Sequence, residues 1–324
     1  MPVPDLSPLH AADLSARFPL RLGTRASPLA MAQAHQAKAA LTAKHGWAED
    51  AITLVPMTAS GDKIQDRALA EVGGKALWTK ELDASLGTGE IDFSVHSMKD
   101  VETIRPTMFV VAAMLKRADV RDRLIGAESI ASLPQGATVG TSSPRRTAQL
   151  LRLRPDFNII LFRGNVATRL GKLAAGEADA TLLAAAGLDR LDMSDTGAAI
   201  SIDEMLPAPS QAAIGLECRA DDAVVRAAIS AVNHAPTCMA VEAERALLAE
   251  LGADCQSPVA ALAVQQQGGA LKLRAELLSL DGQHRVDGEI LLGSTADATP
   301  EALARQLLDR APPPVRKLFA GRAN

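Results

Sequence analysis

The sequence contains few aromatic residues, few cysteines and few histidines. Aromatic side chains make up 2% of the 324 residues and tyrosine is absent, so the hydrophobic cores must be packed from leucine, alanine and valine. Three cysteines, Cys218, Cys238 and Cys255, are too few and too scattered for the disulfide framework of a small secreted protein. The six histidines stand singly, without HxxH or CxxC pairs, so we expect no metal site.

Long hydrophobic runs are missing as well. No stretch approaches the roughly eighteen uninterrupted apolar residues of a membrane span, and residues 1–18 have no basic segment followed by an apolar run. With 48% hydrophobic and 22% charged residues, the composition is that of a soluble globular protein long enough for two or three domains. We therefore expect a cytoplasmic protein that does not associate with a membrane.

Positive charge, by contrast, is concentrated in residues 140–176. The whole chain has a net charge of -4, yet this stretch contains seven cationic side chains and one acidic residue, Asp156. The cationic residues are Arg145, Arg146, Arg152, Arg154, Arg163, Arg169 and Lys172. Because clustered cationic groups repel one another, we expect them to bind an anionic partner.

A helix start places two of these arginines. Ser143 is a favourable N-cap residue and Pro144 suits the first helical position, directly after a short β-type run. Arg145 and Arg146 would then lie in the first turn, where free backbone N–H groups and the helix dipole favour an anion.

A second helix start follows within the same stretch. Asn165 is expected to cap a helix that ends at Gly176, with Arg163 just before it and Arg169 one turn inside. The pattern predicts that the basic side chains gather at helix entrances, where carboxylates or phosphates bind.

The same pattern occurs near the start of the chain. Residues 20–22 read as a strand, followed by Gly23-Thr24, by Ser27-Pro28 and by an alanine-rich helix up to Gly46. Gly23 precedes its counterpart by about 117 residues. Two similar α/β lobes, each pointing a helix N-terminus at a shared cleft, explain the repeat, and chance similarity is the alternative.

The remaining periodicity completes an expected three-domain α/β architecture. Strands are expected at 52–57, 91–96, 108–115, 137–139, 178–184, 213–218, 259–265, 271–278 and 285–292, helices at 75–86, 240–251 and 300–310, and a charged crossover at 116–123. Domain 1 is expected at 1–115 and 213–233 with a lid at 58–74, domain 2 at 120–207, and an α+β domain 3 at 236–324. The last domain would contain a three-stranded antiparallel sheet.

Lys99 and Asp100 lie just past the expected strand at 91–96. Clefts of open α/β sheets place functional groups at such strand ends, although a surface ion pair is the ordinary interpretation. A carboxylate that faces a basic cleft could bind N–H donors and stabilise a cation.

Cys255 is the best candidate for thiol chemistry, because it lies in a loop between a helix and a strand. Cys218 and Cys238 are expected to be inert core thiols, and a buried thiol is the alternative for Cys255 too. Asp254 beside it should disfavour the thiolate, which argues against an unaided nucleophile.

The ligand of the basic stretch is expected to be a small polycarboxylate. Nucleic acid is disfavoured, because single-strand binding usually needs aromatic platforms and the stretch offers only Phe157 and Phe162. Each carboxylate held by an arginine contributes roughly 1.5–3 kcal/mol. A non-catalytic binding protein for a small polycarboxylate on a two-lobed scaffold is one hypothesis that these residues support.

Seven collinear segments resemble the porphobilinogen deaminase family. They are GTRASPLAMAQA, VGGKALWTKELD, DFSVHSMKDV, VGTSSPRRTAQL, RGNVATRL, LLAAAGLDRL and the loop of Cys255. The resemblance implies two lobes like those of periplasmic binding proteins and a third domain. It also implies a monomeric transferase that condenses four porphobilinogen molecules into hydroxymethylbilane and releases four ammonia, with a dipyrromethane cofactor on Cys255.

The resemblance also implies the roles of individual residues. Asp100 matches the catalytic aspartate of the family. The positions that hold the cofactor are Cys255, Lys99, Asp100, Thr141, Ser143, Arg145, Arg146 and Arg169, and those that face the substrate are Arg25, Ser27, Gln33, Arg163 and Arg190. No metal and no nucleic acid are implied.

Several positions depart from the family pattern. Ala253-Asp254 stands where the family usually has Gly-Gly, and Ala212 replaces a glycine in a usual Gln-Gly-Ala. Glu102 occupies a usual proline position two residues after Asp100, and Trp78 a usual phenylalanine position. None of these changes removes a catalytic group.

Overall fold

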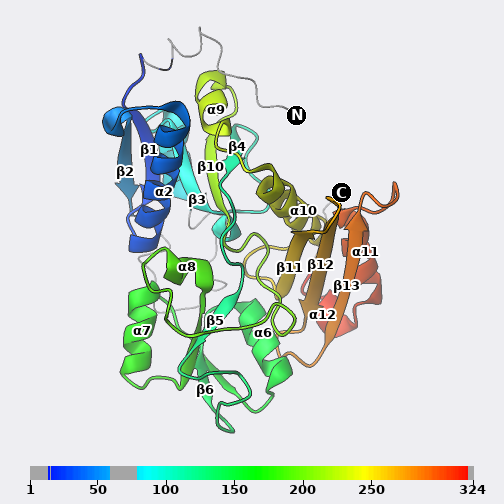
Figure 1. The fold of residues 1–324 in the computed structure, drawn as a ribbon. Coiled ribbons are helices and arrows are strands. Elements are labelled where there is room, and N and C mark those ends of the chain that lie inside the picture. The colour runs from blue at the N-terminus through cyan, green and yellow to red at the C-terminus, as the bar shows by residue number, and fades with distance from the viewer. Residues whose placement is uncertain (1–13, 15, 59–78, 320–324) are drawn as a thin grey trace. The chain divides into compact units, whose positions relative to one another are not determined.

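The computed structural model describes residues 14, 16–58 and 79–319 (Figure 1). Within them the chain forms two compact units. The first contains a five-stranded sheet, and the second contains another five-stranded sheet and a three-stranded one. These sheets confirm the predicted α/β class with a separate three-stranded antiparallel sheet. The predicted domain limits stay predictions.

The first unit, here called the first lobe, has the strand order β2-β1-β3-β10-β4. Its strands are β1 (Leu20–Arg25), β2 (Ile52–Met57), β3 (Phe93–Ser97), β4 (Phe109–Met114) and β10 (Ile214–Arg219). β1 is parallel to β2 and β3, whereas β10 runs antiparallel to β3 and β4. Its described helices are α2 (Pro28–His45), η1 (Glu49–Ala51), α5 (Lys80–Thr88), η2 (Met98–Asp100) and α9 (Ala223–Ser230).

β3 lies at the centre of this sheet and is buried on both faces. The alternating sequence predicted one apolar face, formed by Ile91, Phe93 and Val95. In the structure Ser94 and His96, which point to the opposite face, are buried as well. Because both faces of this strand are buried, the polar residues there need partners inside the protein.

The second unit begins with a sheet of matching topology, here called the second lobe, in the order β7-β6-β8-β5-β9. Its strands are β5 (Asp122–Ile125), β6 (Thr138–Gly140), β7 (Asn158–Ile160), β8 (Ala180–Ala184) and β9 (Ala198–Ala199). β6 is parallel to β7 and β8, and β5 runs antiparallel to β8. Its described helices are α6 (Pro144–Leu153), α7 (Val166–Ala174) and α8 (Ala185–Asp189). The two sheets confirm the pair of similar lobes.

The second unit also contains the three-stranded sheet with its helices. β11 (Val259–Gln265), β12 (Leu271–Leu278) and β13 (Arg285–Leu292) form an antiparallel meander at the predicted boundaries. The helices next to it are α10 (Ala235–Leu251), α11 (Pro300–Arg310) and α12 (Pro313–Arg316). Leu247, Leu273 and Leu303 belong to its aliphatic core.

Local signals explain why both lobes start their helices where they do. Ser27 and Ser143 have extended backbones and cap α2 and α6, each followed by a proline. Gly46 ends α2 with a φ of 67°, a conformation that favours glycine. The predicted lid lies outside the described residues apart from Thr58, as do the first four residues of the helix predicted at 75–86.

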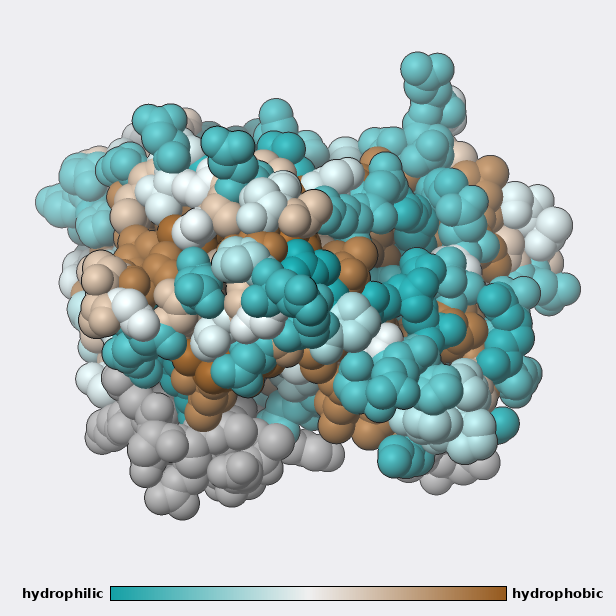
Figure 2. Space-filling model, turned by 90° about the horizontal axis from the view of Figure 1, so that it is seen from below, coloured by the Kyte–Doolittle hydropathy of each residue, from teal (hydrophilic) through white to brown (hydrophobic). Residues whose placement is uncertain are grey.

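Figure 2 shows one face of the molecule, on which hydrophilic and hydrophobic residues are interspersed. Exposed hydrophobic residues are normal for protein surfaces. In the described parts of the chain, no helix is long and apolar enough to cross a membrane.

Candidate functional site

The candidate residues of the first lobe follow the carboxyl ends of two parallel strands. Arg25 ends β1 and Ser27 follows it, whereas Lys99 and Asp100 follow β3 in the short helix η2. Because β1 and β3 pair in parallel, their carboxyl ends lie at one edge of the sheet. Ligands of open α/β sheets bind at such an edge.

The start of α2 presents polar groups at this edge. The Ser27 hydroxyl accepts a hydrogen bond from the Ala30 N–H at 3.4 Å, and Arg25 is half-buried. Gln33 lies further along α2 with 3% of its surface exposed, and its Nε2 has no hydrogen-bond partner among the described residues. A buried amide without a partner is a donor that a ligand could use.

Met98 anchors the start of η2. The Met98 N–H donates to the Ala213 carbonyl at 3.0 Å, and the Met98 side chain is fully buried. β10 leaves room for this side chain with Gly215, because a Cβ there would lie 2.2 Å from the Met98 sulfur. Lys99 and Asp100 themselves are half-buried.

A buried ionic cluster surrounds Arg105 in the same lobe. Arg105 donates to both oxygens of Asp83, at 2.6 and 3.1 Å, and to both oxygens of Glu217, at 2.8 and 2.9 Å. It also donates to Glu102 at 2.7 Å, and His96 lies 3.1 Å from Glu217. Burial alone would raise the pKa of Glu217, but the hydrogen bonds from His96 and Arg105 lower it to about 2. This cluster was not predicted from the sequence, because Asp83 and Glu217 lie 22 and 112 positions from Arg105 in the chain.

The candidate residues of the second lobe follow the carboxyl end of β6. The Thr141 hydroxyl accepts from the Ser143 N–H at 3.2 Å, and the Ser143 hydroxyl accepts from the Arg146 N–H at 3.4 Å. Gly140 is needed at the strand end, because a Cβ there would lie 2.3 Å from the ring of Phe162. The first turn of α6 therefore points its N–H groups to the edge where β6, β7 and β8 end.

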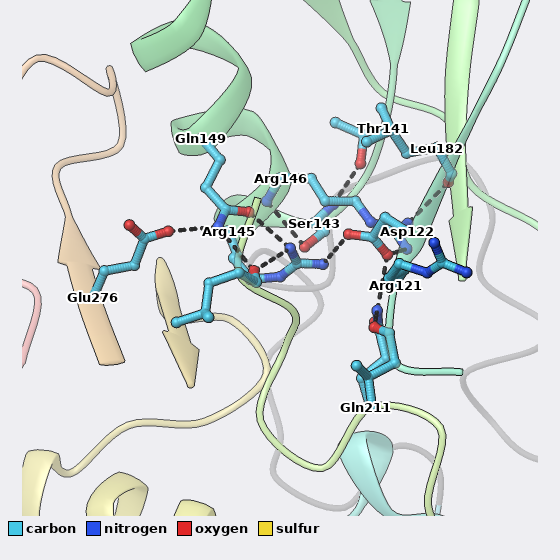
Figure 3. A network of polar contacts seen from close by, with 12 residues as sticks. Arg121, Asp122, Thr141, Ser143, Arg145, Arg146, Gln149, Leu182, Gln211 and Glu276 are labelled. Atoms are coloured by element: carbon cyan, nitrogen blue, oxygen red, sulfur yellow. Dashed lines mark hydrogen bonds and ion pairs between the residues drawn. The ribbon is translucent and has the colours of Figure 1, made fainter. Parts of the chain in front are cut away.

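Arg145 and Arg146 share one buried carboxylate (Figure 3). Arg145 donates to one oxygen of Asp122 at 2.8 Å and Arg146 to the other at 2.7 Å. Gln211 donates to the second oxygen at 2.9 Å. The side chain of Asp122 is 0% exposed, and those of the two arginines are 4% and 6% exposed. Burial would raise the pKa of Asp122, but the two guanidinium groups hold it well below its usual range.

Asp122 corrects one sequence-based expectation and adds to a second. Residues 116–123 were expected to be a charged crossover, but Asp122 begins β5 and points into the protein. The basic stretch was expected to bind an anionic partner, and the structure adds an internal carboxylate that pairs with two of its arginines. The alternation of Asp122 with the buried Leu124 was the available signal, and the charge of the neighbouring residues obscured it.

Three other cations of the basic stretch lie away from the helix entrances, contrary to expectation. Arg152 is in the last turn of α6 and Arg154 is its C-cap, where it pairs with Asp156 at 2.8 Å. Lys172 is in the last turn of α7 and lies 3.7 Å from Glu177. A basic side chain at the C-terminal end of a helix is stabilised by the negative end of the helix dipole.

Arg163 and Arg169 lie near the entrance of α7, whereas Arg190 lies at the C-terminal end of α8. Arg169 donates to the Gly164 carbonyl at 3.1 Å and to the Ser142 hydroxyl at 3.4 Å, which joins the starts of α6 and α7. Arg163 is buried just before α7, whose N-cap is Asn165 as predicted. Arg190 follows α8, and burial lowers its pKa to about 10.

The three cysteines differ in accessibility. Cys218 is buried in β10, and burial raises the pKa of its thiol to about 12, as expected for an inert core thiol. Cys238 is half-buried in α10, whereas Cys255 is exposed in the loop between α10 and β11. In this loop the Asp254 carboxylate accepts from the Gln256 N–H at 2.8 Å.

The second lobe has buried donors that suit a polycarboxylate cofactor. The Nε atoms of Arg145 and Arg146 are buried and have no hydrogen-bond partner among the described residues. A guanidinium binds carboxylate through such N–H groups, so these residues fit an acidic ligand at the start of α6. Among residues 14, 16–58 and 79–319, no group of His, Cys, Asp or Glu side chains could hold a metal ion.

Comparison with known families covers most of the chain. Residues 20–227 match the model of the porphobilinogen deaminase, dipyromethane cofactor binding domain. Residues 238–309 match the model of the porphobilinogen deaminase C-terminal domain.

Individual relatives and solved structures are similar as well. The chain is 62% identical to porphobilinogen deaminase of Sphingopyxis alaskensis over 93% of this chain and 97% of the relative. It is 48% identical to porphobilinogen deaminase of Paracoccus denitrificans over 91% and 95% of the two chains. The VFT2 domain of BvgS from Bordetella pertussis matches 71% of this chain and 92% of its own, with a TM-score of 0.40 and 15% identity.

Proposed function

This chain belongs to the porphobilinogen deaminase family, and on that premise we propose how its residues carry out the reaction. The protein is a transferase that condenses four porphobilinogen molecules head to tail into hydroxymethylbilane and releases four ammonia. It uses a dipyrromethane cofactor.

We propose that the cofactor is attached through a thioether to Cys255. This thiol is the exposed one of the three cysteines, which supports the assignment. Bound there, the cofactor supplies the pyrrole carbon to which the first substrate unit is joined. We assign the binding of its carboxylates to Lys99, Asp100, Thr141, Ser143, Arg145, Arg146 and Arg169.

Asp100 is assigned the catalytic role. Loss of ammonia from porphobilinogen leaves a cationic azafulvene, and a nearby carboxylate stabilises that cation as it forms. At about 4 Å and an effective dielectric near 20 the attraction is roughly 4 kcal/mol. The same carboxylate can accept hydrogen bonds from pyrrole N–H groups, which would orient the ring for the next bond.

The substrate carries an acetate and a propionate, and cationic or amide donors would bind them. Arg25, Ser27, Gln33, Arg163 and Arg190 are assigned this role. Gln33 supports it directly, because its buried Nε2 has no partner among the described residues.

One observation carries the assignment of the cofactor site. Arg145 and Arg146 lie in the first turn of α6 and are oriented by Asp122, and each still has one buried N–H without a partner among the described residues. Two guanidinium groups held by one carboxylate leave a net positive charge at a helix N-terminus. That arrangement favours a carboxylate ligand.

Intact mass under denaturing conditions tests the attachment. We expect the purified protein to be heavier than its sequence by two pyrrole units, and Cys255→Ser to have the mass of the sequence alone and no turnover. Cys238→Ser is the matched control and should keep both the added mass and the activity. An added mass that persists in Cys255→Ser would remove this residue from its assigned role.

We also propose that the protein acts as a cytoplasmic monomer, as the family resemblance predicts. Light scattering coupled to size-exclusion chromatography measures the oligomeric state. A mass of twice the chain would contradict the monomer.

A further inference from the structure

The Arg105 cluster involves residues on both sides of Asp100 in the chain. His96 precedes Asp100 by four residues, and Glu102 and Arg105 follow it by two and five. Glu217 of β10 contacts both His96 and Arg105, so the cluster joins the end of β3 to the segment that leaves η2.

The guanidinium of Arg105 is fully engaged. It forms two-pronged contacts with Asp83 and Glu217, one bond to Glu102 and a longer one of 3.4 Å to the Thr79 hydroxyl. Its side chain is 9% exposed and that of Glu217 is 0% exposed. A planar guanidinium with this many acceptors fixes their relative positions, which a lysine ammonium would not do.

The backbone around Asp100 has little regular structure of its own. η2 is a single 3₁₀ turn, closed by a long Val101 N–H to Met98 carbonyl contact of 3.4 Å. No helix or strand is present from residue 101 to residue 108. Short 3₁₀ turns have poor hydrogen-bond geometry, so the position of Asp100 depends on what anchors the flanking residues.

The Thr79 hydroxyl binds Glu102 instead of capping its own helix. Thr79 is the N-cap residue of α5, but its side chain makes no capping hydrogen bond. Its hydroxyl donates instead to Glu102 at 2.7 Å. Glu102 therefore ties the start of α5 to Arg105, although a threonine at this position usually stabilises its own helix.

We propose that Arg105 is a positioning residue for Asp100, acting with Glu102 to fix the turn that carries the carboxylate. This inference rests on the catalytic role proposed for Asp100. The residues before the turn are held through His96 and Glu217, and those after it through Glu102 and Arg105. Arg105 thereby sets the distance between the carboxylate and the substrate without touching either.

The substitution Arg105→Lys tests the proposal in the holoenzyme. It keeps the charge but loses the two-pronged contacts, so the turn should shift. A displacement of about 1 Å in a catalytic group costs up to about a hundredfold in rate. We expect kcat to fall at least about tenfold, with KM changed less than about twofold and the added cofactor mass retained.

Arg21→Lys is the matched control. Arg21 makes a similar two-pronged contact with Asp92 in the same lobe, at 2.8 and 3.1 Å, but at the amino ends of β1 and β3. It should change thermal stability and leave kcat within about twofold. Equal kcat values for the two variants would overturn the proposal.

A double-mutant cycle separates this inference from the role of Asp100. If Arg105 acts through Asp100, Arg105→Lys should have little further effect on the residual kcat of Asp100→Asn. A further full tenfold loss in that background would contradict the positioning role. High activity of Asp100→Asn alone would contradict the proposed function instead.

Glu102→Gln serves if Arg105→Lys does not fold. It keeps the shape and one oxygen acceptor at a side chain that is 19% exposed, so the fold should persist. We expect kcat to fall about threefold to tenfold with an unchanged KM, because a neutral amide binds the guanidinium more weakly. An unchanged kcat would overturn the proposal.

Discussion

The two lobes bury their charges in opposite ways. In the first lobe one guanidinium, Arg105, is surrounded by the carboxylates of Asp83, Glu102 and Glu217. In the second lobe one carboxylate, Asp122, is surrounded by two guanidinium groups. Both clusters use charge-assisted hydrogen bonds between elements that are distant in sequence.

The two clusters therefore differ in the sign of their net charge. The first cluster has more carboxylates than cations and includes residues close in sequence to Asp100, the proposed stabiliser of a cation. The second has more cations than carboxylates and orients the first turn of α6, where acidic groups of the cofactor are proposed to bind. The clusters also differ in the number of ion pairs that one substitution removes. Arg105 pairs with three carboxylates, so losing one leaves two, whereas both arginines of the second cluster pair with Asp122.

Asp122→Asn should lower the free energy of unfolding more than any other substitution in either cluster. Both arginines would lose their charged partner while staying buried, and breaking a buried ion pair typically costs about 3–5 kcal/mol. Urea unfolding of the variant should show a loss of that size. Asp203→Asn is the control, since Asp203 forms an exposed pair with Arg274 and should change stability by less than about 1 kcal/mol. Similar losses in both variants would refute the special role of Asp122.

Asp100→Asn tests whether the carboxylate of the first lobe does the chemistry. The roughly 4 kcal/mol of cation stabilisation corresponds to about a thousandfold in kcat. We expect that loss with the cofactor mass intact, measured by steady-state kinetics and mass spectrometry. Arg169→Leu is the matching variant in the second lobe and should reduce the fraction of protein that carries the cofactor. Wild-type turnover in Asp100→Asn would end the assignment.

Glu217→Gln tests the charge of the first cluster, because its effect on stability should depend on pH. The pKa of Glu217 in the folded protein is about 2, against an ordinary value of 4.5. A lowered pKa means that the carboxylate stabilises the fold fully above about pH 4.5 and loses this contribution as the pH falls toward 2. The shift corresponds to about 3 kcal/mol.

The measurement compares wild type and variant across that range. Near pH 6 Glu217→Gln should be less stable by up to about 3 kcal/mol, and the gap should narrow as the pH approaches 2. Asp203→Asn should show no comparable narrowing. A gap that stays constant with pH would mean that the charge of Glu217 does not stabilise the fold.

The sequence predicted those parts of the fold that depend on local signals. Ser27 and Ser143 predicted the starts of α2 and α6, because capping depends on only a few neighbouring residues. The alternation and turns of the last domain gave its strands with their observed boundaries, since each hairpin neighbour is also a sequence neighbour. β9 was missed, as two residues carry no periodicity.

The buried charges could not be predicted in the same way. Asp122 and Glu217 are acidic residues among other charged or apolar ones, and their burial depends on partners 23 and 112 positions away. Periodicity reports which face is apolar but not whether a polar face is covered by another element. For the site residues, strand ends indicated Asp100 and helix starts indicated Arg145, whereas the individual roles came from the family resemblance.

The smallest predicted effect concerns the point where the chain leaves the second unit. Ala212 has a φ of 70°, and its carbonyl accepts from Arg190 at 2.7 Å. A non-glycine residue in the left-handed region costs about 1–2 kcal/mol, whereas glycine costs about 0.5–1 kcal/mol in chain entropy. Ala212→Gly should therefore raise the free energy of unfolding by about 0.5–1 kcal/mol.

Ala213→Gly is the matched control, because it makes the same change one residue later in the first unit. Both alanines are buried, but Ala213 is not among the described residues with positive φ, so glycine there loses packing and adds chain entropy without relieving strain. Urea unfolding should show opposite signs for the two variants. Destabilisation by both would mean that Arg190 and the neighbouring contacts hold Ala212 without strain, and that the departure from the family's glycine at this position has no cost.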